Sequence, residues 1–370
     1  MREWEETSFK DKSTGERLDM SGSGLNVAVV GATGAVGREM LKILEERSLE
    51  AASIRALASP RSAGSRVPFQ GDELEVETLT EDVFQELDLA LFSAGGDISK
   101  EFAPLAAQAG CVVVDNSSAW RMDPEVPLVV PEVNAEDLSW HRNIIANPNC
   151  STIQMVVVLN PLHEAAKIKR VVVSTYQAVS GSGQKAVDEL ESQVRALFNM
   201  QEVECNAYPY QIAFNCLPQI GSFLDNDYTQ EEMKMVNETR KILGDETIGI
   251  SATTVRVPVF YGHSEAVNLE MASPVSAKEA RGILSEAPGV IVWDNPAEKI
   301  YPMALEATGQ DYTYVGRIRQ DTSLENGLDM WIVADNIRKG AARRAEELTC
   351  MDWKTLIAYL PGLSSIWSSW

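Results

Sequence analysis

The stretch VAVVGATGAVGREM, residues 27–40, places three glycines between a hydrophobic run and an amphipathic segment. Gly31, Gly34 and Gly37 have the spacing GxxGxxG, which differs from the more familiar GxGxxG. Glycines at a strand-to-helix turn let backbone N–H groups approach a pyrophosphate at the helix N-terminus. The turn therefore predicts a dinucleotide site, although a tight strand–helix loop without a ligand would use the same glycines.

Short β-rich runs and helical stretches alternate downstream of this turn. Strands are expected at residues 53–58, 87–94 and 111–117, with a helix at 99–110 between the last two. This alternation is typical of a Rossmann-type, doubly wound parallel sheet. We expect this first domain to cover residues 25–149, after a mobile leader at residues 1–24 that has no apolar core typical of a secretion signal.

The pattern changes after Cys150, where the β-rich runs become longer. Residues 169–177, 248–272 and 329–337 predict strands of a mainly antiparallel sheet with helices on one face. We assign residues 150–334 to a second, α+β domain. A helix at about 335–348 is expected to pack back on the first domain, and residues 349–370 form a tail.

The amino-acid composition and net charge disfavour some classes of binding partner. The 370 residues are 45% hydrophobic and carry a formal net charge of −22, which disfavours nucleic acid and anionic membranes as partners. No apolar run reaches transmembrane length. The five cysteines, Cys111, Cys150, Cys205, Cys216 and Cys350, are scattered, with no spacing typical of a metal site or a disulfide framework. These features favour a cytoplasmic protein without a metal, in which a few local cations would bind any anionic substrate.

The end of the second predicted strand bears on the choice between NAD and NADP. An acidic side chain there would accept hydrogen bonds from the ribose 2′-hydroxyl of NAD, whereas arginine suits a 2′-phosphate. The segment ALASPRSAGSR has no acid but offers Ser59, Arg61 and Ser62. NADP is therefore favoured, and a solvated surface loop is the alternative.

Cys150 lies between NPN and an apolar run that could open a helix. A helix N-terminus lowers the pKa of a thiol, which would make this cysteine a nucleophile, whereas a buried structural thiol is the alternative. A nucleophile needs a base, and the chain has three histidines. His141 is expected to be exposed and His163 to be an ordinary helix residue. His263 follows a glycine and shares a segment with Arg256, so it is the candidate base, although an isolated histidine is more often structural.

These motifs together resemble the aspartate-semialdehyde dehydrogenase family, in its bacterial form, from about residue 25 to residue 348. The motifs that carry the resemblance include GATGAVG, LASPRSAG, NPNCSTIQMV, STYQAVSGSG, EEMKMVNETRKIL, VRVPVFYGHSE and ADNIRKGAA. The resemblance implies NADPH-dependent reductive dephosphorylation of L-aspartyl 4-phosphate to L-aspartate 4-semialdehyde, which is reversible. It also implies a place in lysine (diaminopimelate), threonine, methionine and isoleucine biosynthesis, and a homodimer or homotetramer.

The resemblance also implies roles for individual residues. Cys150 matches the nucleophile that forms a thioester, His263 the general acid/base, and Gln177 the residue that orients the intermediate. The matching substrate-binding residues are Arg121, Asn149, Gln177, Glu231, Lys234 and Arg256, of which Arg121 and Lys234 match the phosphate-binding cations. The matching cofactor-binding residues are Gly31, Thr33, Gly34, Ala35, Val36, Ser59, Arg61, Ser62, Ser180, Gly181 and Asn336.

Two other interpretations fit less well. N-acetyl-glutamyl-phosphate reductases use the same thioester chemistry, but their nucleophile segment resembles NPGC rather than NPNC. A non-catalytic homologue is expected to have lost its nucleophile or base, whereas this chain keeps both Cys150 and His263. For Cys205 and Cys216, burial in a packed segment is expected.

Overall fold

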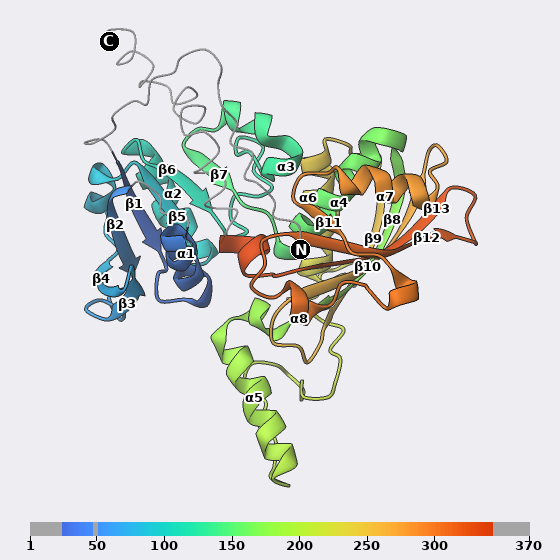
Figure 1. Ribbon diagram of the computed structural model, residues 1–370. Coiled ribbons are helices and arrows are strands. Elements are labelled where there is room, and N and C mark those ends of the chain that lie inside the picture. The colour runs from blue at the N-terminus through green and yellow to red at the C-terminus, as the bar shows by residue number, and fades with distance from the viewer. Residues whose placement is uncertain (1–23, 47–50, 343–370) are drawn as a thin grey trace.

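The computed structural model describes residues 24–46 and 51–342, which form two sheets of different type (Figure 1). The first sheet has seven strands in the order β3-β4-β2-β1-β5-β6-β7, and all neighbours are parallel except β3 and β4. Its strands are β1 (Leu25–Val30), β2 (Ala51–Ala58), β3 (Arg66–Phe69), β4 (Asp72–Thr78), β5 (Leu89–Phe92), β6 (Val112–Asp115) and β7 (Ile144–Ala146). Its helices are α1 (Ala35–Glu46), η1 (Glu81–Glu86), α2 (Gly96–Gln108), α3 (Pro131–Asn134) and η2 (Ala135–Trp140).

The second sheet has six strands in the order β11-β12-β13-β10-β8-β9. The β8–β9 and β11–β12 pairs are parallel and the other three pairs are antiparallel. Its strands are β8 (Ile168–Gln177), β9 (Gly249–Arg256), β10 (His263–Met271), β11 (Val290–Val292), β12 (Thr313–Asp321) and β13 (Gly327–Ala334). The remaining helices are α4 (Cys150–Ala166), η3 (Val179–Ser182), α5 (Gln184–Phe198), α6 (Gln230–Leu243), α7 (Ala277–Ser285), η4 (Pro296–Glu298), α8 (Ala304–Ala307) and η5 (Arg338–Ala342). The predicted fold class is confirmed.

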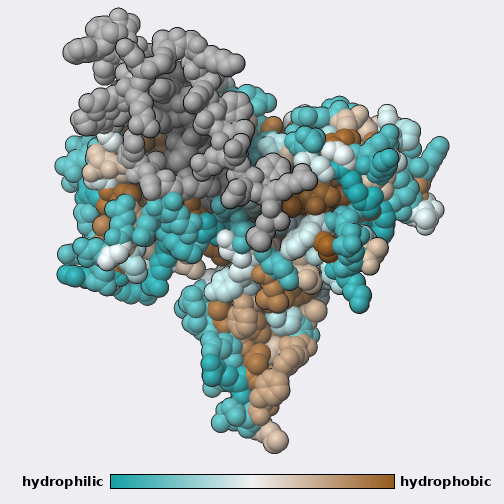
Figure 2. Space-filling model, in the orientation of Figure 1, coloured by the Kyte–Doolittle hydropathy of each residue, from teal (hydrophilic) through white to brown (hydrophobic). Residues whose placement is uncertain are grey.

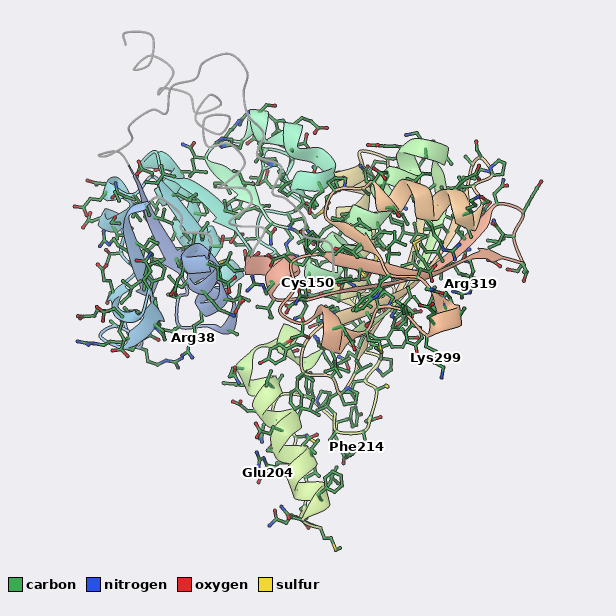
Figure 3. The ribbon with its side chains drawn as sticks, viewed as in Figure 1. Arg38, Cys150, Glu204, Phe214, Lys299 and Arg319 are labelled. Carbon is green, nitrogen blue, oxygen red and sulfur yellow. The ribbon has the colours of Figure 1, made fainter. Side chains whose placement is uncertain are left out.

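Helix α4 joins the two sheets. Its residues from Ser151 to Leu159 are all buried, and a helix that is apolar on every side belongs in a protein interior. One continuous core runs from β1 and β5 of the first sheet through Ile153 and Val157 of this helix to β10 and β13 of the second. This packing fixes the N-terminus of α4 between the domains, where Figure 3 shows Cys150.

Helix α5 and the chain that follows it form an arm that projects away from both sheets (Figure 1). The arm has a small core of its own, which includes Leu190, Ile212 and Leu217. Cys205 and Cys216 lie in this part of the chain and are exposed, so the expectation that they pack in a core is wrong. So small a core cannot cover all the side chains of the segment.

The chain after β13 returns to the first domain. Arg338 forms ion pairs with Glu39 at 2.8 Å and Glu46 at 2.6 Å, both on α1, and with Asp311 at 3.0 Å. Of the expected 335–348 helix, residues 335–342 are described, and among these only Arg338–Ala342 are helical, as the π-helix η5. The expected leader up to residue 23, the tail and Cys350 lie outside the described residues.

Candidate active site

Cys150 is the first residue of α4, and Asn149 is its N-cap. The Asn149 Oδ1 atom accepts hydrogen bonds from the backbone N–H groups of Ser151 at 3.0 Å and Thr152 at 3.3 Å. Such a cap satisfies two amides that helical carbonyls cannot reach. The NPNC sequence therefore specifies the start of the helix and presents Cys150 at the edge of a cavity of about 540 Å³ between the domains.

Gly340 of η5 packs directly against Cys150. A Cβ atom at Gly340 would collide with the Cβ of Cys150 and would lie 2.9 Å from its Cα. A glycine is required at this close approach. The sequence prediction did not find this contact, because GAA in a helical run gives no sign of what faces it.

The electrostatic setting of the thiol differs from the expectation. Burial raises the pKa of Cys150 to about 12, and the Glu231 carboxylate adds to the rise. Arg256, Arg121 and Lys234 act in the opposite direction. The predicted lowering of this pKa by the helix N-terminus is therefore outweighed by desolvation, and the thiol is protonated at neutral pH.

A buried carboxylate, Glu231 of α6, organises the polar groups around the cysteine. Its Oε1 accepts from Asn149 Nδ2 at 2.8 Å and from Gln177 Nε2 at 3.2 Å, and its Oε2 lies 3.1 Å from Lys234 Nζ. Burial would raise the pKa of Glu231, but the Lys234 charge and the two amide hydrogen bonds outweigh it and lower the pKa. Glu231 is thus held as an anion, and it orients three of the predicted substrate-binding side chains.

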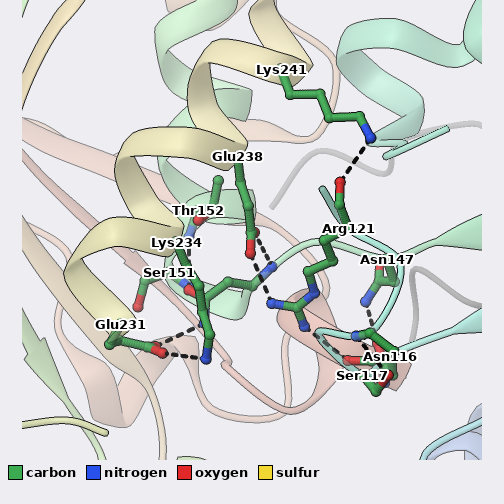
Figure 4. A network of polar contacts seen from close by, with 12 residues as sticks. Asn116, Ser117, Arg121, Asn147, Ser151, Thr152, Glu231, Lys234, Glu238 and Lys241 are labelled. Atoms are coloured by element: carbon green, nitrogen blue, oxygen red, sulfur yellow. Dashed lines mark hydrogen bonds and ion pairs between the residues drawn. The ribbon is translucent and has the colours of Figure 1, made fainter. Parts of the chain in front are cut away.

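Arg121 and Lys234 line the same cavity as Cys150. The Arg121 guanidinium donates from Nη1 to Glu238 Oε1 at 3.0 Å and from Nη2 to the Asn116 carbonyl at 2.8 Å (Figure 4). Its Nε is buried without a hydrogen-bond partner among the described residues. This places two cations beside the Cys150 thiol, which is an arrangement that suits an anionic substrate.

Arg256 and His263 meet behind Gly181. A Cβ atom at Gly181 would lie 3.0 Å from Arg256 Nη1 and 3.2 Å from His263 Nε2. Arg256 donates from Nη1 to the Ala178 carbonyl at 2.6 Å, and its Nε has no partner within the described chain. Arg256 and Gly181 line the cavity, whereas His263 lies one layer deeper and is fully buried.

The protonation of His263 is set by its surroundings. Its Nδ1 accepts from the Ala178 N–H at 3.0 Å, and Nε2 has no partner among the residues described. Burial and the Arg256 charge lower the pKa of His263 to about 3. The imidazole is therefore neutral at physiological pH.

The other two histidines have structural positions. His141 is buried and its Nδ1 accepts from the Asn143 N–H at 3.1 Å, so the expectation of an exposed side chain is wrong. His163 closes the end of α4, where its Nδ1 accepts from the Ile168 N–H at 3.1 Å.

The glycine-rich turn follows β1, at the carboxyl ends of the parallel strands of the first sheet. A Cβ at Gly31, whose φ is +86°, would lie 2.9 Å from the Ser93 backbone, and a Cβ at Gly37 would collide with the Gly31 carbonyl. The turn can pack this closely against Ser93 and against the start of α1 only because these side chains are absent. The open cradle, with Gly34, Ala35 and Val36 lining the cavity, fits a dinucleotide phosphate.

Among the predicted cofactor residues, Gly31 and Thr33 belong to the glycine-rich turn but are not among the residues that line the cavity. The others fall into two groups. Gly34, Ala35, Val36, Ser180, Gly181 and Asn336 line the cavity together with Cys150. Asn336 Oδ1 accepts from the Gly262 N–H at 3.0 Å and Ser180 Oγ lies 3.2 Å from it, which ties the segment after β13 to the second domain. The second group, Ser59, Arg61 and Ser62, does not line the cavity. These residues belong to the turn after β2. That turn lies beside the glycine-rich turn, because β1 and β2 are parallel neighbours.

Comparisons with known proteins agree with this site. The description "Semialdehyde dehydrogenase, NAD binding domain" matches residues 26–141, and "Semialdehyde dehydrogenase, dimerisation domain" matches residues 159–339. The aspartate-semialdehyde dehydrogenase of Aquifex aeolicus is 56% identical over 329 residues, which are 88% of this chain and 97% of that protein. The chain belongs to the aspartate-semialdehyde dehydrogenase family. The resemblance noted in the sequence is confirmed.

Other members of the aspartate-semialdehyde dehydrogenase family show how far the likeness extends. The Bacillus subtilis enzyme is 51% identical over 87% of this chain and 95% of its own length. The solved aspartate semialdehyde dehydrogenase II of Vibrio cholerae has a TM-score of 0.87 at 47% identity and covers 90% of this chain and 99% of that chain. The Candida albicans structure, which contains NADP, has a TM-score of 0.71 at 26% identity and covers 90% of this chain and all of its own. This family member is therefore an oxidoreductase with an NAD(P)-binding domain.

Two further observations concern the part of the chain that the structure describes. No helix within 24–46 and 51–342 is both long and apolar enough to cross a membrane. In the same ranges no group of His, Cys, Asp and Glu side chains is arranged to hold a metal ion.

The raised pKa of Cys150 predicts how this thiol reacts with iodoacetamide. Because the protonated thiol dominates well below pH 12, its alkylation rate should rise by about tenfold per pH unit between pH 7 and 9. Peptide mass spectrometry follows Cys150, and exposed Cys205 in the same digest is the reference. A rate that is already constant across this interval would contradict the account.

Proposed function

We propose that the protein interconverts L-aspartyl 4-phosphate and L-aspartate 4-semialdehyde plus phosphate, with NADP as the cofactor. One observation carries the proposal: the helix-terminal Cys150 shares a single cavity with Arg121, Lys234 and Arg256 and with the glycine-rich turn. A cavity that combines a thiol, three cations and a dinucleotide cradle suits thioester chemistry on a phosphorylated, carboxylated substrate. The family's role in amino-acid biosynthesis fits this reaction.

Cys150 and His263 carry the covalent chemistry in this proposal. The Cys150 sulfur attacks the acyl carbon while its proton passes to His263 Nε2, and the bond to the phosphate oxygen breaks. A protonated histidine is unfavourable in its buried site, so it readily returns the proton when the thiol is regenerated. Cys150 is the first residue of α4, so its backbone N–H has no carbonyl acceptor within the helix. This N–H can donate to the oxyanion that forms on the acyl carbon.

The remaining polar side chains hold the substrate. Arg256 has the fork geometry to bind the α-carboxylate, and the Glu231 anion suits the α-ammonium group. Gln177 and Asn149 both donate to Glu231, which keeps their amide groups beside the sulfur. Binding and orientation at this site come from fixed groups, so little reorganisation is needed on substrate binding.

Arg121 and Lys234 receive the phosphate. Both line the cavity beside Cys150, and the Arg121 Nε has no hydrogen-bond partner among the described residues. Phosphate carries away the negative charge that develops as the acyl bond breaks, and cations at this position favour its departure. In the reverse direction the same pair presents phosphate to the thioester.

The dinucleotide site would hold NADP through the residues already described. When bound, the reduced cofactor supplies the hydride that converts the thioester to a hemithioacetal. The cradle at Gly31, Thr33 and Gly34 suits the pyrophosphate, and Ser180, Gly181 and Asn336 line the adjoining wall of the cavity. Ser59, Arg61 and Ser62 would receive the 2′-phosphate, because their turn lies beside the cradle at the edge of the sheet.

Arg61→Glu tests the NADP preference. The substitution replaces a cation by an anion beside the expected 2′-phosphate, so KM for NADP should rise by about tenfold or more. KM for NAD should change little, because NAD lacks that phosphate. Equal losses with the two cofactors would show that Arg61 does not recognise the 2′-phosphate.

The proposed reaction is tested by NADPH formation from L-aspartate 4-semialdehyde and NADP. The purified full-length protein should form NADPH in a phosphate-dependent way, followed by absorbance. NADPH formation that does not respond to phosphate would point to a non-phosphorylating aldehyde dehydrogenase. No turnover by a folded protein would favour a non-catalytic homologue.

We also infer a cytoplasmic homodimer, because a thiol nucleophile must stay reduced and the second domain matches a dimerisation domain. The face of the second sheet opposite α4 carries exposed Tyr176, Tyr301 and Met303, which is the kind of apolar patch that a partner subunit covers. Two such subunits related by a twofold axis would bury the same face on each.

Ala266→Arg tests the inferred interface. Ala266 lies on β10 opposite Trp331, on this uncovered face, so a charge there should shift the protein toward monomer in size-exclusion chromatography with light scattering. Ala109→Arg, at the exposed end of α2, is the matched control and should leave the mass unchanged. A dimer that persists in Ala266→Arg would place the interface elsewhere, for example on the arm, where Figure 2 shows apolar side chains and Phe198 and Met200 are exposed.

A further inference from the structure

Glu238 of α6 is a buried carboxylate that contacts two parts of the site at once. Its side chain is 1% exposed. Its Oε1 accepts from Arg121 Nη1 at 3.0 Å (Figure 4). Its Oε2 accepts from the Asn149 backbone N–H at 2.6 Å. One carboxylate thus joins an arginine beside the cavity to the residue that caps the Cys150 helix.

The face of α6 that carries Glu238 is directed at the site along its length. Glu231, Lys234, Glu238 and Lys241 follow one another at intervals of three or four residues, so they share one face of the helix. Lys241 Nζ donates to the backbone carbonyl of Arg121 at 2.8 Å, as well as to two carbonyls further along that loop. Helix α6 therefore holds Arg121 at its backbone through Lys241 and at its guanidinium through Glu238.

These contacts leave Arg121 with one fixed orientation. Glu238 and the Asn116 carbonyl each take one terminal nitrogen, and the guanidinium is planar, so its remaining donors point in set directions. An unpaired arginine can sample many rotamers, and ordering it at the moment of anion binding costs free energy. A carboxylate that orders the guanidinium in advance removes that cost.

We propose that Glu238 is a positioning residue that fixes the Arg121 guanidinium relative to the N-terminus of α4, so that phosphate is presented to the carbon bound to Cys150. The proposal rests on the proposed function, in which Arg121 binds phosphate. It concerns a residue that touches neither substrate nor cofactor and acts through its two partners.

A purely electrostatic role for Glu238 makes the opposite prediction. A carboxylate near an anion site repels phosphate, so removing its charge would strengthen phosphate binding and lower KM for phosphate. Loss of positioning weakens phosphate binding and raises this KM. The sign of the change in KM for phosphate therefore separates the two roles.

Glu238→Gln is the variant that tests the proposal. The amide cannot accept both hydrogen bonds, because its nitrogen would face one of the two donors, either Arg121 Nη1 or the Asn149 N–H. In the direction of NADPH formation, KM for phosphate should rise by about tenfold, while KM for NADP should stay within about twofold of the wild-type value. An unchanged or lowered KM for phosphate would overturn the proposal.

Glu232→Gln is the matched control. Like Glu238, Glu232 is a buried glutamate of α6. It accepts from the backbone N–H groups of Thr229 and Thr254. Neither of these residues belongs to the Arg121 loop or to α4. Its substitution should lower the melting temperature and leave KM for phosphate unchanged. A rise of similar size in both variants would reduce Glu238 to a structural role and overturn the proposal.

A double variant covers the case in which Glu238→Gln alone does not fold, since it leaves the buried Arg121 cation without its anion. Arg121→Met and Arg121→Met/Glu238→Gln remove the cation first. If Glu238 acts through Arg121, these two proteins should have KM values for phosphate within about twofold of each other. A larger difference would overturn the proposal. Wild-type protein without phosphate-dependent turnover would instead refute the proposed function.

Discussion

Replacement of Cys150 by serine should reduce phosphate-dependent NADPH formation by at least about 10⁴-fold, which is the size of loss seen when a covalent nucleophile is removed. The hydroxyl keeps the volume and the place at the N-terminus of α4. It does not replace the nucleophile, because an alcohol gives up its proton far less readily than a thiol. Steady-state rates of the two proteins at saturating L-aspartate 4-semialdehyde and NADP measure the effect.

The matched control for this substitution is Cys216→Ser. Cys216 is a free, exposed thiol on the arm, outside the residues that line the cavity, so its removal should leave the rate within about twofold of wild type. Activity that survives in Cys150→Ser, or is lost in Cys216→Ser, would mean that Cys150 is not the nucleophile.

Replacement of His263 by asparagine should lower kcat by about 10²–10⁴-fold, the usual contribution of a general acid–base. Asparagine Oδ1 can take over the hydrogen bond from the Ala178 N–H, which His263 Nδ1 accepts in the native protein. The substitution therefore keeps the contact that positions the segment and removes only the nitrogen available to a proton. Thermal unfolding and kcat, measured together, separate a catalytic loss from a structural one.

His163→Asn is the companion variant. His163 Nδ1 accepts from the Ile168 N–H in the same manner, but the side chain lies at the far end of α4 from Cys150. We expect a lower melting temperature with kcat unchanged. A kcat in His263→Asn close to that of His163→Asn would remove His263 from the mechanism.

The parts of the site that the sequence revealed are those specified by a short local motif. The glycines of GATGAVG predict the turn after β1, and the NPNC segment before an apolar run predicts a helix start at Cys150. Strand alternation was enough for the fold class, because the parallel and antiparallel sheets differ in strand length and connection. Strands β3, β4, β7, β11 and β12 were not predicted, and length alone does not explain this, since β12 has nine residues whereas β5 and β6, with four each, were predicted.

Residues that act through distant contacts were not found in this way. Glu238 has partners 117 and 89 residues away, and in the sequence it resembles any charged residue on a helix. Gly340 matters only because the chain after β13 returns to Cys150. The pKa of Cys150 was misjudged for a related reason: the helix N-terminus is visible in the sequence, whereas the burial that outweighs it depends on both domains.

The central claim is that an aspartyl thioester forms on Cys150, and trapping it is the most direct test. The protein is mixed with L-aspartate 4-semialdehyde and NADP without phosphate, quenched in acid and digested for mass spectrometry. We predict one aspartyl group on the peptide that contains Cys150, formed together with a burst of NADPH and lost when phosphate is added. Turnover without this adduct, or an acyl group on another residue, would contradict the account.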